Sequence, residues 1–236
     1  MIPNSHRVYL MGDFHGHTEL LKENLQKITT VASPSALIML GDYDVHTAPE
    51  MLELKDLLAE YSIDFYLLRG NHDNPMYWQD RGVSGVFEGE HFHLLHEVDG
   101  IQWGDVRFLT VNGAVSVDRT CLRFDRGHCW PETEPVPKDA VDQIRKLKEQ
   151  HGAFDVLLSH TGVISGKTIK SEFTKSFAST DETLFEDLEK ERALMQRIQI
   201  ASGVESHYFG HFHQRWQGDE HEIDCRCLDI CELIQL

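Results

Sequence analysis

Side chains that can bind a metal ion or transfer a proton stand directly behind five short apolar segments of the sequence. They are Asp13 and His15, Asp42, Asn71 and His72, His160, and His211 with His213. Taken singly, each has an ordinary explanation as a helix cap, a turn residue or a structural histidine. Together they follow one apolar segment after another, which random polar residues would not do. Because open α/β sheets bind ligands at the carboxyl ends of their strands, we expect these side chains to converge on one edge of a sheet.

The mixture of carboxylate, amide oxygen and imidazole limits the kind of ion. This mixture suits manganese, iron, zinc or nickel, and the lack of thiolates among the candidates argues against a structural zinc site. Seven of the residues are candidate ligands, which is too many for one ion. The number suits two ions that share a bridging carboxylate.

The elements that would position these groups alternate between short strands and helices. Apolar runs at 8–11, 36–40 and 65–68 predict strands, and helical spacing of leucines follows the first two. A glycine and then Asp or Asn come after each strand. This βα order predicts parallel strands with right-handed crossovers.

The second half of the chain is more extended. Segments 92–96 and 106–111 predict strands of a second sheet, joined through a turn at 98–100. Further along, the pattern predicts a helix, a strand, a second helix and a C-terminal hairpin, at 138–151, 154–158, 181–202 and beyond 208.

Two stretches, 116–137 and 162–179, have no clear period. We interpret them as irregular insertions near the site, because long irregular loops in compact domains are usually functional or disordered. No linker divides the chain, so we expect one domain over residues 1–236.

Composition and net charge limit the classes of molecule that this protein is expected to bind. The 236 residues are 41% apolar, and 22 basic against 39 acidic side chains give a formal charge of −17. Nucleic-acid binding rests largely on Lys and Arg neutralising phosphates, so duplex nucleic acid is disfavoured as a partner. A phosphate substrate would need a local positive centre, which bound metal cations can supply.

The sequence also bears on location. Its first residues lack the basic segment, apolar stretch and cleavage site of a signal peptide, and no apolar run reaches the roughly 18 residues of a membrane helix. The five cysteines are an odd number without the spacing of a disulfide framework. We therefore expect reduced thiols in a cytoplasmic protein without a membrane partner.

Five blocks resemble the metal-ligand motifs of the calcineurin-like metallophosphoesterase superfamily, in the family's order and across nearly the whole chain. They are G-D-F-H (Gly12 to His15), G-D-Y-D (Gly41 to Asp44), G-N-H-D (Gly70 to Asp73), S-H (Ser159-His160) and G-H-F-H (Gly210 to His213). The resemblance implies an α/β fold, a four-layer αββα sandwich of two mixed β-sheets flanked by helices.

By the same resemblance, two divalent metal ions would share the site. Metal one would be held by Asp13, His15 and His213, metal two by Asn71, His160 and His211, and Asp42 would bridge them. Manganese is our first choice for the ions, and iron, zinc and nickel are alternatives. Two such ions about 3.5–4 Å apart clamp a phosphoryl group and acidify a bridging water for in-line attack.

His72 resembles the family's histidine that is not a ligand. That histidine would contact the phosphoryl oxygens or protonate the leaving alkoxide. In the phosphoprotein phosphatase branch its carboxylate partner comes from the second block. Asp44 stands one residue early here, and we take it as the candidate partner.

Other positions depart from that branch. His46 stands near the place of its phosphate-binding arginine, and Asp73 replaces a glutamate, so both weaken a serine/threonine phosphatase assignment. The G-D-x-H-G opening at 12–16 still leans toward that branch and its diadenosine-polyphosphate-hydrolysing relatives. Arginine contacts to phosphate could come from the first insertion, and a solvated loop is the alternative interpretation for the three residues concerned, Arg119, Arg123 and Arg126.

The sequence thus predicts a dinuclear metal-dependent hydrolase of phosphoric esters, acting on a small phosphoester or a nucleotide. A serine/threonine protein phosphatase and a dinucleoside-polyphosphate hydrolase are alternatives within the enzyme class. Outside it stands a metal-bound scaffold that binds a partner. Degenerate relatives of that kind normally lose ligands, whereas this chain keeps all seven and His72.

Overall fold

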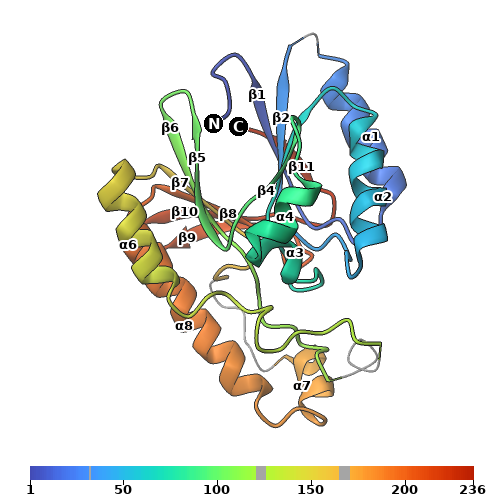
Figure 1. The fold of residues 1–236 in the computed structure, drawn as a ribbon. Helices are drawn as coiled ribbons and strands as arrows, with labels where there is room; N and C mark the ends of the chain where they lie inside the picture. The colour runs from blue at the N-terminus through green and yellow to red at the C-terminus, as the bar shows by residue number, and fades with distance from the viewer. Residues whose placement is uncertain (32, 121–125, 165–170) are drawn as a thin grey trace.

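Two mixed β-sheets packed face to face, with helices on both outer faces, make up the computed structural model (Figure 1). It describes residues 1–31, 33–120, 126–164 and 171–236. The predicted α/β sandwich is therefore confirmed. None of the helices in these four stretches combines the length and the apolar character needed to cross a membrane.

The first sheet has the strand order β11-β1-β2-β3-β4. Its strands are β1 (Arg7–Met11), β2 (Ser35–Met39), β3 (Asp64–Leu67), β4 (Phe92–Leu94) and β11 (Leu233–Gln235). The strands β1 to β4 run parallel, and β11 pairs antiparallel with β1.

The second sheet has the order β5-β6-β7-β8-β10-β9. Its strands are β5 (Val98–Trp103), β6 (Val106–Val111), β7 (Val156–Ser159), β8 (Ser206–Phe209), β9 (Trp216–Glu220) and β10 (Ile223–Cys227). The strands β6, β7, β8 and β10 are parallel, while β5 and β9 are antiparallel edges.

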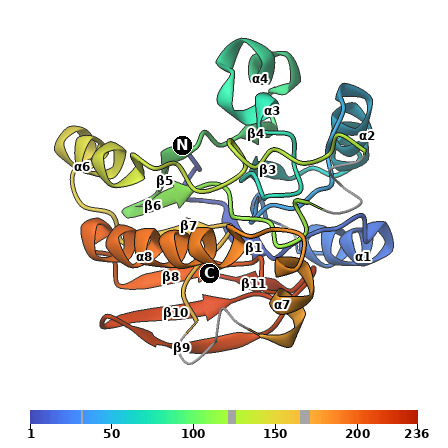
Figure 2. The ribbon, with the colours of Figure 1, turned by 90° about the horizontal axis from the view of Figure 1, so that it is seen from below.

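Helices cover the two outer faces. Figure 1 shows α1 (Thr18–Thr29) and α2 (Ala48–Ala59) outside the first sheet, and α6 (Ala140–His151) and α8 (Leu184–Ser202) outside the second. Three shorter helices are α3 (Met76–Gln79), α4 (Arg81–Phe87) and α7 (Glu172–Ala178). Seen from below, α1 and α2 lie on one side of the strands and α6 on the other (Figure 2).

The layers follow from the alternation of side chains along each strand. In β1, Val8 and Leu10 lie in the core between the sheets, whereas Tyr9 and Met11 lie in the core beneath α1 and α2. In β7, Leu158 belongs to the core between the sheets, while Leu157 packs under α6 and α8. Strands buried on both faces read as continuous apolar runs, which is why the sequence locates them well.

The prediction for 92–96 is wrong about the sheet. β4 extends the first sheet, with Phe92 in register with Phe65 of β3, while only 106–111 enters the second sheet. The predicted turn at 98–100 is instead the start of β5. Gly100 lies within this strand, where a Cβ would contact the Phe154 ring at 3.1 Å, so the glycine serves close packing and not a turn.

The insertion at 162–179 is not irregular throughout. Its described part contains α7, which begins after Ser171. The Ser171 side chain caps this helix and accepts a hydrogen bond of 3.1 Å from the backbone N–H of Thr174. The seven residues of this helix are too few for a helical period to stand out in the sequence.

A series of buried, hydrogen-bonded side chains connects β7, β8 and α8. The side chains of Gln199 and His207 lie 3.0 Å apart, His207 Nε2 lies 2.6 Å from Ser159 Oγ, and that hydroxyl donates to the Thr161 carbonyl at 2.6 Å. Burial lowers the pKa of His207 to about 3, so the imidazole is neutral. Ser159 directly precedes His160, so these hydrogen bonds help to fix the position of that candidate ligand.

We predict that His207 makes stability fall as the pH falls below its ordinary pKa of 6.5. The unfolded chain binds a proton there while the folded chain does not until about pH 3, so His207 adds a slope of up to about 1.4 kcal/mol per pH unit between these values. Urea unfolding at pH 7.5 and pH 5 measures it. The variant His207→Gln should lose less stability across this interval than the parent, and equal losses would contradict the assignment.

Candidate metal centre

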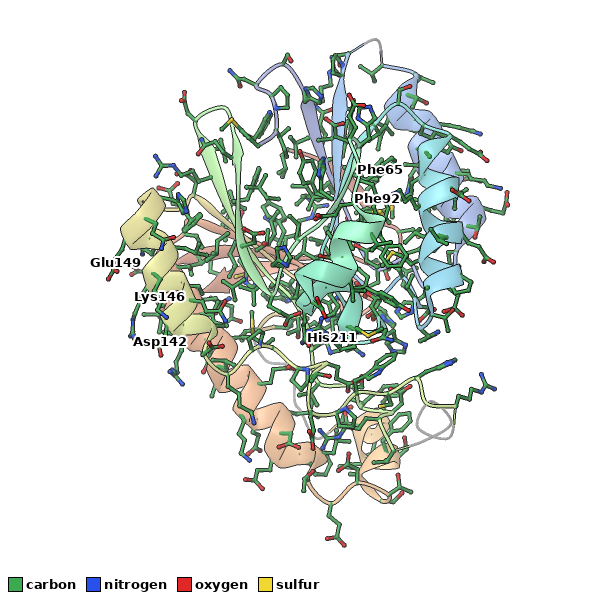
Figure 3. The ribbon with its side chains drawn as sticks, in the orientation of Figure 1. Phe65, Phe92, Asp142, Lys146, Glu149 and His211 are labelled. Carbon is green, nitrogen blue, oxygen red and sulfur yellow. The ribbon has the colours of Figure 1, made fainter. Side chains whose placement is uncertain are left out.

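All seven candidate ligands meet at the edge where the parallel strands of both sheets end. Figure 3 labels His211 at this lower end of the sandwich. One group joins Asp13, His15, Asp42 and His213, and another joins Asp42, His160 and His211, with one ligand atom from each residue within 4.8 Å of the others. Both groups could hold a metal ion.

Asp42 belongs to both groups. Its Oδ2 lies 3.3 Å from His15 Nε2, and its Oδ1 lies 3.3 Å from His160 Nε2. Each carboxylate oxygen therefore faces a different group of donors. This is the arrangement that a bridging ligand needs.

The second group has the geometry of a metal site. His160 Nδ1 lies 2.7 Å from the Leu40 carbonyl oxygen and donates to it, which turns Nε2 toward Asn71 Oδ1 at 2.9 Å. His211 Nδ1 approaches the same Asn71 oxygen at 2.9 Å. With Nδ1 donating to Leu40, a neutral His160 presents Nε2 as an acceptor to the acceptor oxygen of Asn71, and a proton or a metal cation between them would relieve this contact. Two ligands at right angles, each about 2.1 Å from an ion, lie roughly 3 Å apart, so the spacing fits.

The first group also fits a cation. His15 Nε2 and His213 Nε2 are 2.9 Å apart, and Asp13 Oδ2 lies 3.4 Å from His213. Asp13 Oδ1 is fully buried without a hydrogen-bond partner among the described residues. A buried carboxylate oxygen left in that state is costly, and a metal ion would satisfy it.

Electrostatics at the centre point the same way. Burial raises the pKa of Asp13 to about 7. Burial disfavours charge on His15 and His160, but hydrogen bonds to Asp42 and Asp44 raise the pKa of His15 to about 11, and the charge of Asp42 raises that of His160 to about 9. Protons thus compensate the carboxylates in the metal-free protein. Metal binding would release them, so affinity should increase with pH.

Unusual backbone conformations bring these groups together. Five residues of the centre have positive φ angles without being glycine, namely His15 (42°), Asp42 (54°), Asp44 (58°), His211 (65°) and His213 (48°). Each such conformation is strained by about 1–3 kcal/mol and persists only where the surroundings enforce it. Strain of this kind clusters at functional sites, and no periodicity in the sequence reveals it.

The glycines of the motifs make room for the carboxylates. A Cβ on Gly70 would clash with the Asp42 side chain and backbone, and a Cβ on Gly210 would clash with the Asp13 carboxylate. Gly70 therefore allows neighbouring strand ends of the first sheet to touch, and Gly210 allows strand ends of opposite sheets to touch.

His72 and Asp44 lie beside the two groups of candidate ligands. His72 Nδ1 is 3.3 Å from Asp44 Oδ1, and the same oxygen is 3.5 Å from His15 Nδ1. The backbone N–H of His72 donates to Asp42 Oδ1 at 2.9 Å. One carboxylate thus orients two imidazoles, one of them a candidate ligand and one not.

The flanking residues of the G-N-H-D block serve the structure. The buried Asp73 carboxylate accepts hydrogen bonds from the backbone of Gly70 (2.9 Å), Tyr43 (2.8 Å) and Val45 (3.3 Å). It ties the loop after β3 to the loop after β2. Arg69 is fully buried, pairs with both oxygens of Glu97 at 3.0 Å, and donates to the Glu134 carbonyl at 2.9 Å. No pattern in the sequence indicates that connection to the first insertion.

Ser116 is a contributor that sequence reasoning missed. Asn71 Nδ2 donates to Ser116 Oγ at 2.8 Å, which aims the amide oxygen at the two histidines. The backbone N–H of Ser116 donates to Glu134 Oε1 at 3.2 Å. Ser116 stands in the run N-G-A-V-S-V-D at 112–118, where it was only one small residue among several, and a serine in such a run does not show which side chain it will meet.

The arginines of the first insertion divide into three cases. Arg119 is buried, and its guanidinium binds Asp181 at 2.5 Å, Asp187 at 2.8 Å and Thr183 at 2.9 Å. Arg126 is exposed, and Arg123 lies outside the described residues. The Arg119 guanidinium is held by its three partners, so it is neither solvated nor directed at the centre. A contact between these arginines and a substrate stays a prediction, and the contacts of Arg119 do not support it.

Comparison with known proteins gives one family. A family model described as calcineurin-like phosphoesterase matches residues 6–215. No curated protein sequence matches the chain.

Solved structures share the fold at low identity. The protein TT1561 of Thermus thermophilus has a TM-score of 0.61 at 11% identity, covering 96% of this chain and 90% of its own. A dimetal phosphatase from Danio rerio has a TM-score of 0.58 at 10% identity, covering 96% and 88%. A phosphopantetheinyl hydrolase from Mycobacterium tuberculosis has a TM-score of 0.53 at 14% identity, covering 96% and 91%.

We predict that Gly210→Ala weakens metal binding because the added methyl group displaces the Asp13 carboxylate. Manganese titration by calorimetry should show affinity at least about tenfold lower, a loss on the scale of disturbing the groups that orient a ligand. The matched control is Gly85→Ala, where a Cβ meets nothing within 4 Å. Equal affinities in the two variants would argue against this role of Gly210.

We also predict that Ser116→Ala lowers the affinity for the ion that Asn71, His160 and His211 would hold by about tenfold, since the Asn71 amide loses the partner that orients it. The same titration checks this. Ser35→Ala removes another buried serine hydroxyl, at the amino end of β2, and should leave binding unchanged. A Ser116→Ala protein with parental metal affinity would contradict the prediction.

Proposed function

The chain belongs to the calcineurin-like phosphoesterase family, and from this premise we propose that it is a dinuclear metal-dependent hydrolase of phosphoric esters. The observation that carries the proposal is the position of Asp42, whose two oxygens face two separate sets of donors. The names of two structural neighbours, a dimetal phosphatase and a phosphopantetheinyl hydrolase, agree with this reaction class.

In this proposal Asp13, His15, Asp42 and His213 would hold one ion, and Asp42, Asn71, His160 and His211 the other. The ions, manganese first among the candidates, would supply Lewis-acid stabilisation of the phosphoryl charge and an acidified water. Asp44 holds Nδ1 of His72 and so fixes the orientation of the ring. His72 would then contact a phosphoryl oxygen or protonate the leaving alkoxide through its other ring nitrogen.

Small phosphoesters and nucleotides are the proposed substrates, ahead of protein phosphates and dinucleoside polyphosphates. The residues described around the centre keep the complete ligand set, which favours an enzyme over a partner-binding scaffold. We further propose that the whole chain forms one domain and that the protein is cytoplasmic.

We predict that manganese-loaded protein hydrolyses members of a panel of phosphomonoesters, phosphodiesters and pyrophosphates. Asp42→Asn should abolish turnover and reduce the bound metal, because it disturbs both groups of ligands. His72→Gln should keep the metal and lower kcat by roughly 10²–10⁴-fold, the usual contribution of a proton-transferring group. Metal analysis and initial rates with manganese, iron, zinc and nickel provide the measurements.

The control is Asp142→Asn, on the outer face of α6 and distant from His211 (Figure 3). It should match the parent protein in rate and metal content. A folded protein with two bound ions and no turnover of any panel member would favour the scaffold. A large metal-dependent rise in Tm without turnover would instead indicate a purely stabilising ion.

A further inference from the structure

A cavity of about 400 Å³ opens directly beside the metal centre. Asp42, Asn71, His72, His211 and His213 form its inner end. Its outer walls come from α7, α8 and the loop segments 117–118 and 161–164, and Figure 1 shows α7 below the strand ends, beside the beginning of α8. A phosphoryl group held at the centre would therefore leave the rest of its molecule in this cavity.

The outer walls are mainly apolar. They include Val117, Phe173, Phe177, Leu188 and Met195. Phe173 is 66% exposed and packs edge-to-face against Phe177 with ring centroids 5.2 Å apart. Apolar side chains that together line an open cavity indicate an apolar ligand, because scattered surface hydrophobic residues do not form such a lining.

The charged groups in the cavity disfavour a second anionic group on the substrate. Arg192 is the only arginine or lysine among the described residues that line it, whereas Asp118 and Glu191 bring carboxylates. Glu191 is held in place by the backbone N–H of Val115 at 2.8 Å. Burial raises the pKa of Glu191 to about 7, so this carboxyl group is only partly ionised near neutral pH. Further phosphates of a nucleotide would find only Arg192 as an arginine or lysine partner among the described lining residues, whereas an uncharged apolar group needs no such partner.

We propose that this cavity binds the apolar part of the substrate, so that, of the small phosphoesters and nucleotides proposed above, phosphoric esters of apolar alcohols are the preferred substrates. The inference rests on the proposed function and adds the substrate class to it. Each buried methylene group should raise kcat/KM about threefold to fourfold, because it leaves water for an apolar wall.

The test compares two esters of the same length. One is octyl phosphate, and the other is the phosphate of diethylene glycol monoethyl ether, in which two ether oxygens replace methylene groups. The glycol ether is the better leaving group because its ether oxygen withdraws electrons, so a higher kcat/KM for the octyl ester reports burial and not leaving-group ability. The same chains are also tested as 4-nitrophenyl diesters, and adenosine monophosphate is the nucleotide comparator. Manganese-loaded protein should prefer the octyl esters by at least about tenfold.

Substitutions of apolar residues in the cavity wall test whether the preference for octyl esters arises in the cavity. Leu188→Asn on α8 and Phe177→Gln on α7 should each reduce the octyl-to-ether ratio by several fold. The matched control is Ile200→Asn, also on α8 but 65% exposed and not part of the lining, and it should keep the parental ratio. Using two wall variants keeps the test decisive if one of them fails to fold.

The outcomes separate the two proposals. Hydrolysis of both chains at equal rates, or faster hydrolysis of adenosine monophosphate, would overturn the apolar-substrate inference and leave the phosphoesterase proposal intact. If no ester is hydrolysed, the phosphoesterase proposal fails, and calorimetry with octylphosphonate and its ether analogue decides the inference alone. Binding of octylphosphonate at least tenfold tighter would support it, and equal binding would refute it.

Discussion

The structure depends on two buried carboxylates, Asp13 and Asp42, that come from the ends of neighbouring strands. Both are almost completely buried at the edge between the two sheets, and the charge of Asp42 adds to the burial that raises the pKa of Asp13. Two like charges in such a place need positive charge nearby. Around them stand imidazoles from further loops, including His160, which belongs to the opposite sheet. The fold therefore places at one point several groups that favour the binding of cations. Cations bound there would attract a phosphate even though the chain has a net charge of −17.

The candidate ligands lie close together only because the backbone lets the loops that carry them approach one another. The loops after β2 and β3 are joined by the Asp73 carboxylate, which binds three backbone N–H groups, and a glycine in each of the two loops lets the chains touch. Positive φ angles at His15, Asp42 and His211 then turn the side chains inward. The stability of two packed sheets holds these strained conformations in place, so the cores far from the centre contribute to its geometry. Packing and chemistry are linked through the backbone at the strand ends.

The sequence predicted the centre better than it predicted its surroundings. Ligand types recur after apolar strands, and the parallel strands gather them, so Asp13 to His213 could be placed without coordinates. Other features depend on contacts distant in sequence. Periodicity could not assign β4 to the first sheet or recognise Gly100 as a packing residue under Phe154. Nor could it identify Ser116 as the partner of Asn71, because both residues lie in loops whose approach is set by the whole sandwich.

The first insertion differs from the centre because it is joined to the segment that follows the second insertion. Arg119 in the first insertion binds Asp181, Thr183 and Asp187, which follow the second insertion and lead into α8. These bonds satisfy the guanidinium within the protein, so its position favours a part in holding the wall over a part in binding phosphate. The centre is fixed by short loops from both sheets, whereas the apolar wall depends on α7, α8 and this buried ion pair. Changes in the insertions can therefore alter which alcohol is accepted without moving the ligands, since the ligands come from the strand ends and the wall does not.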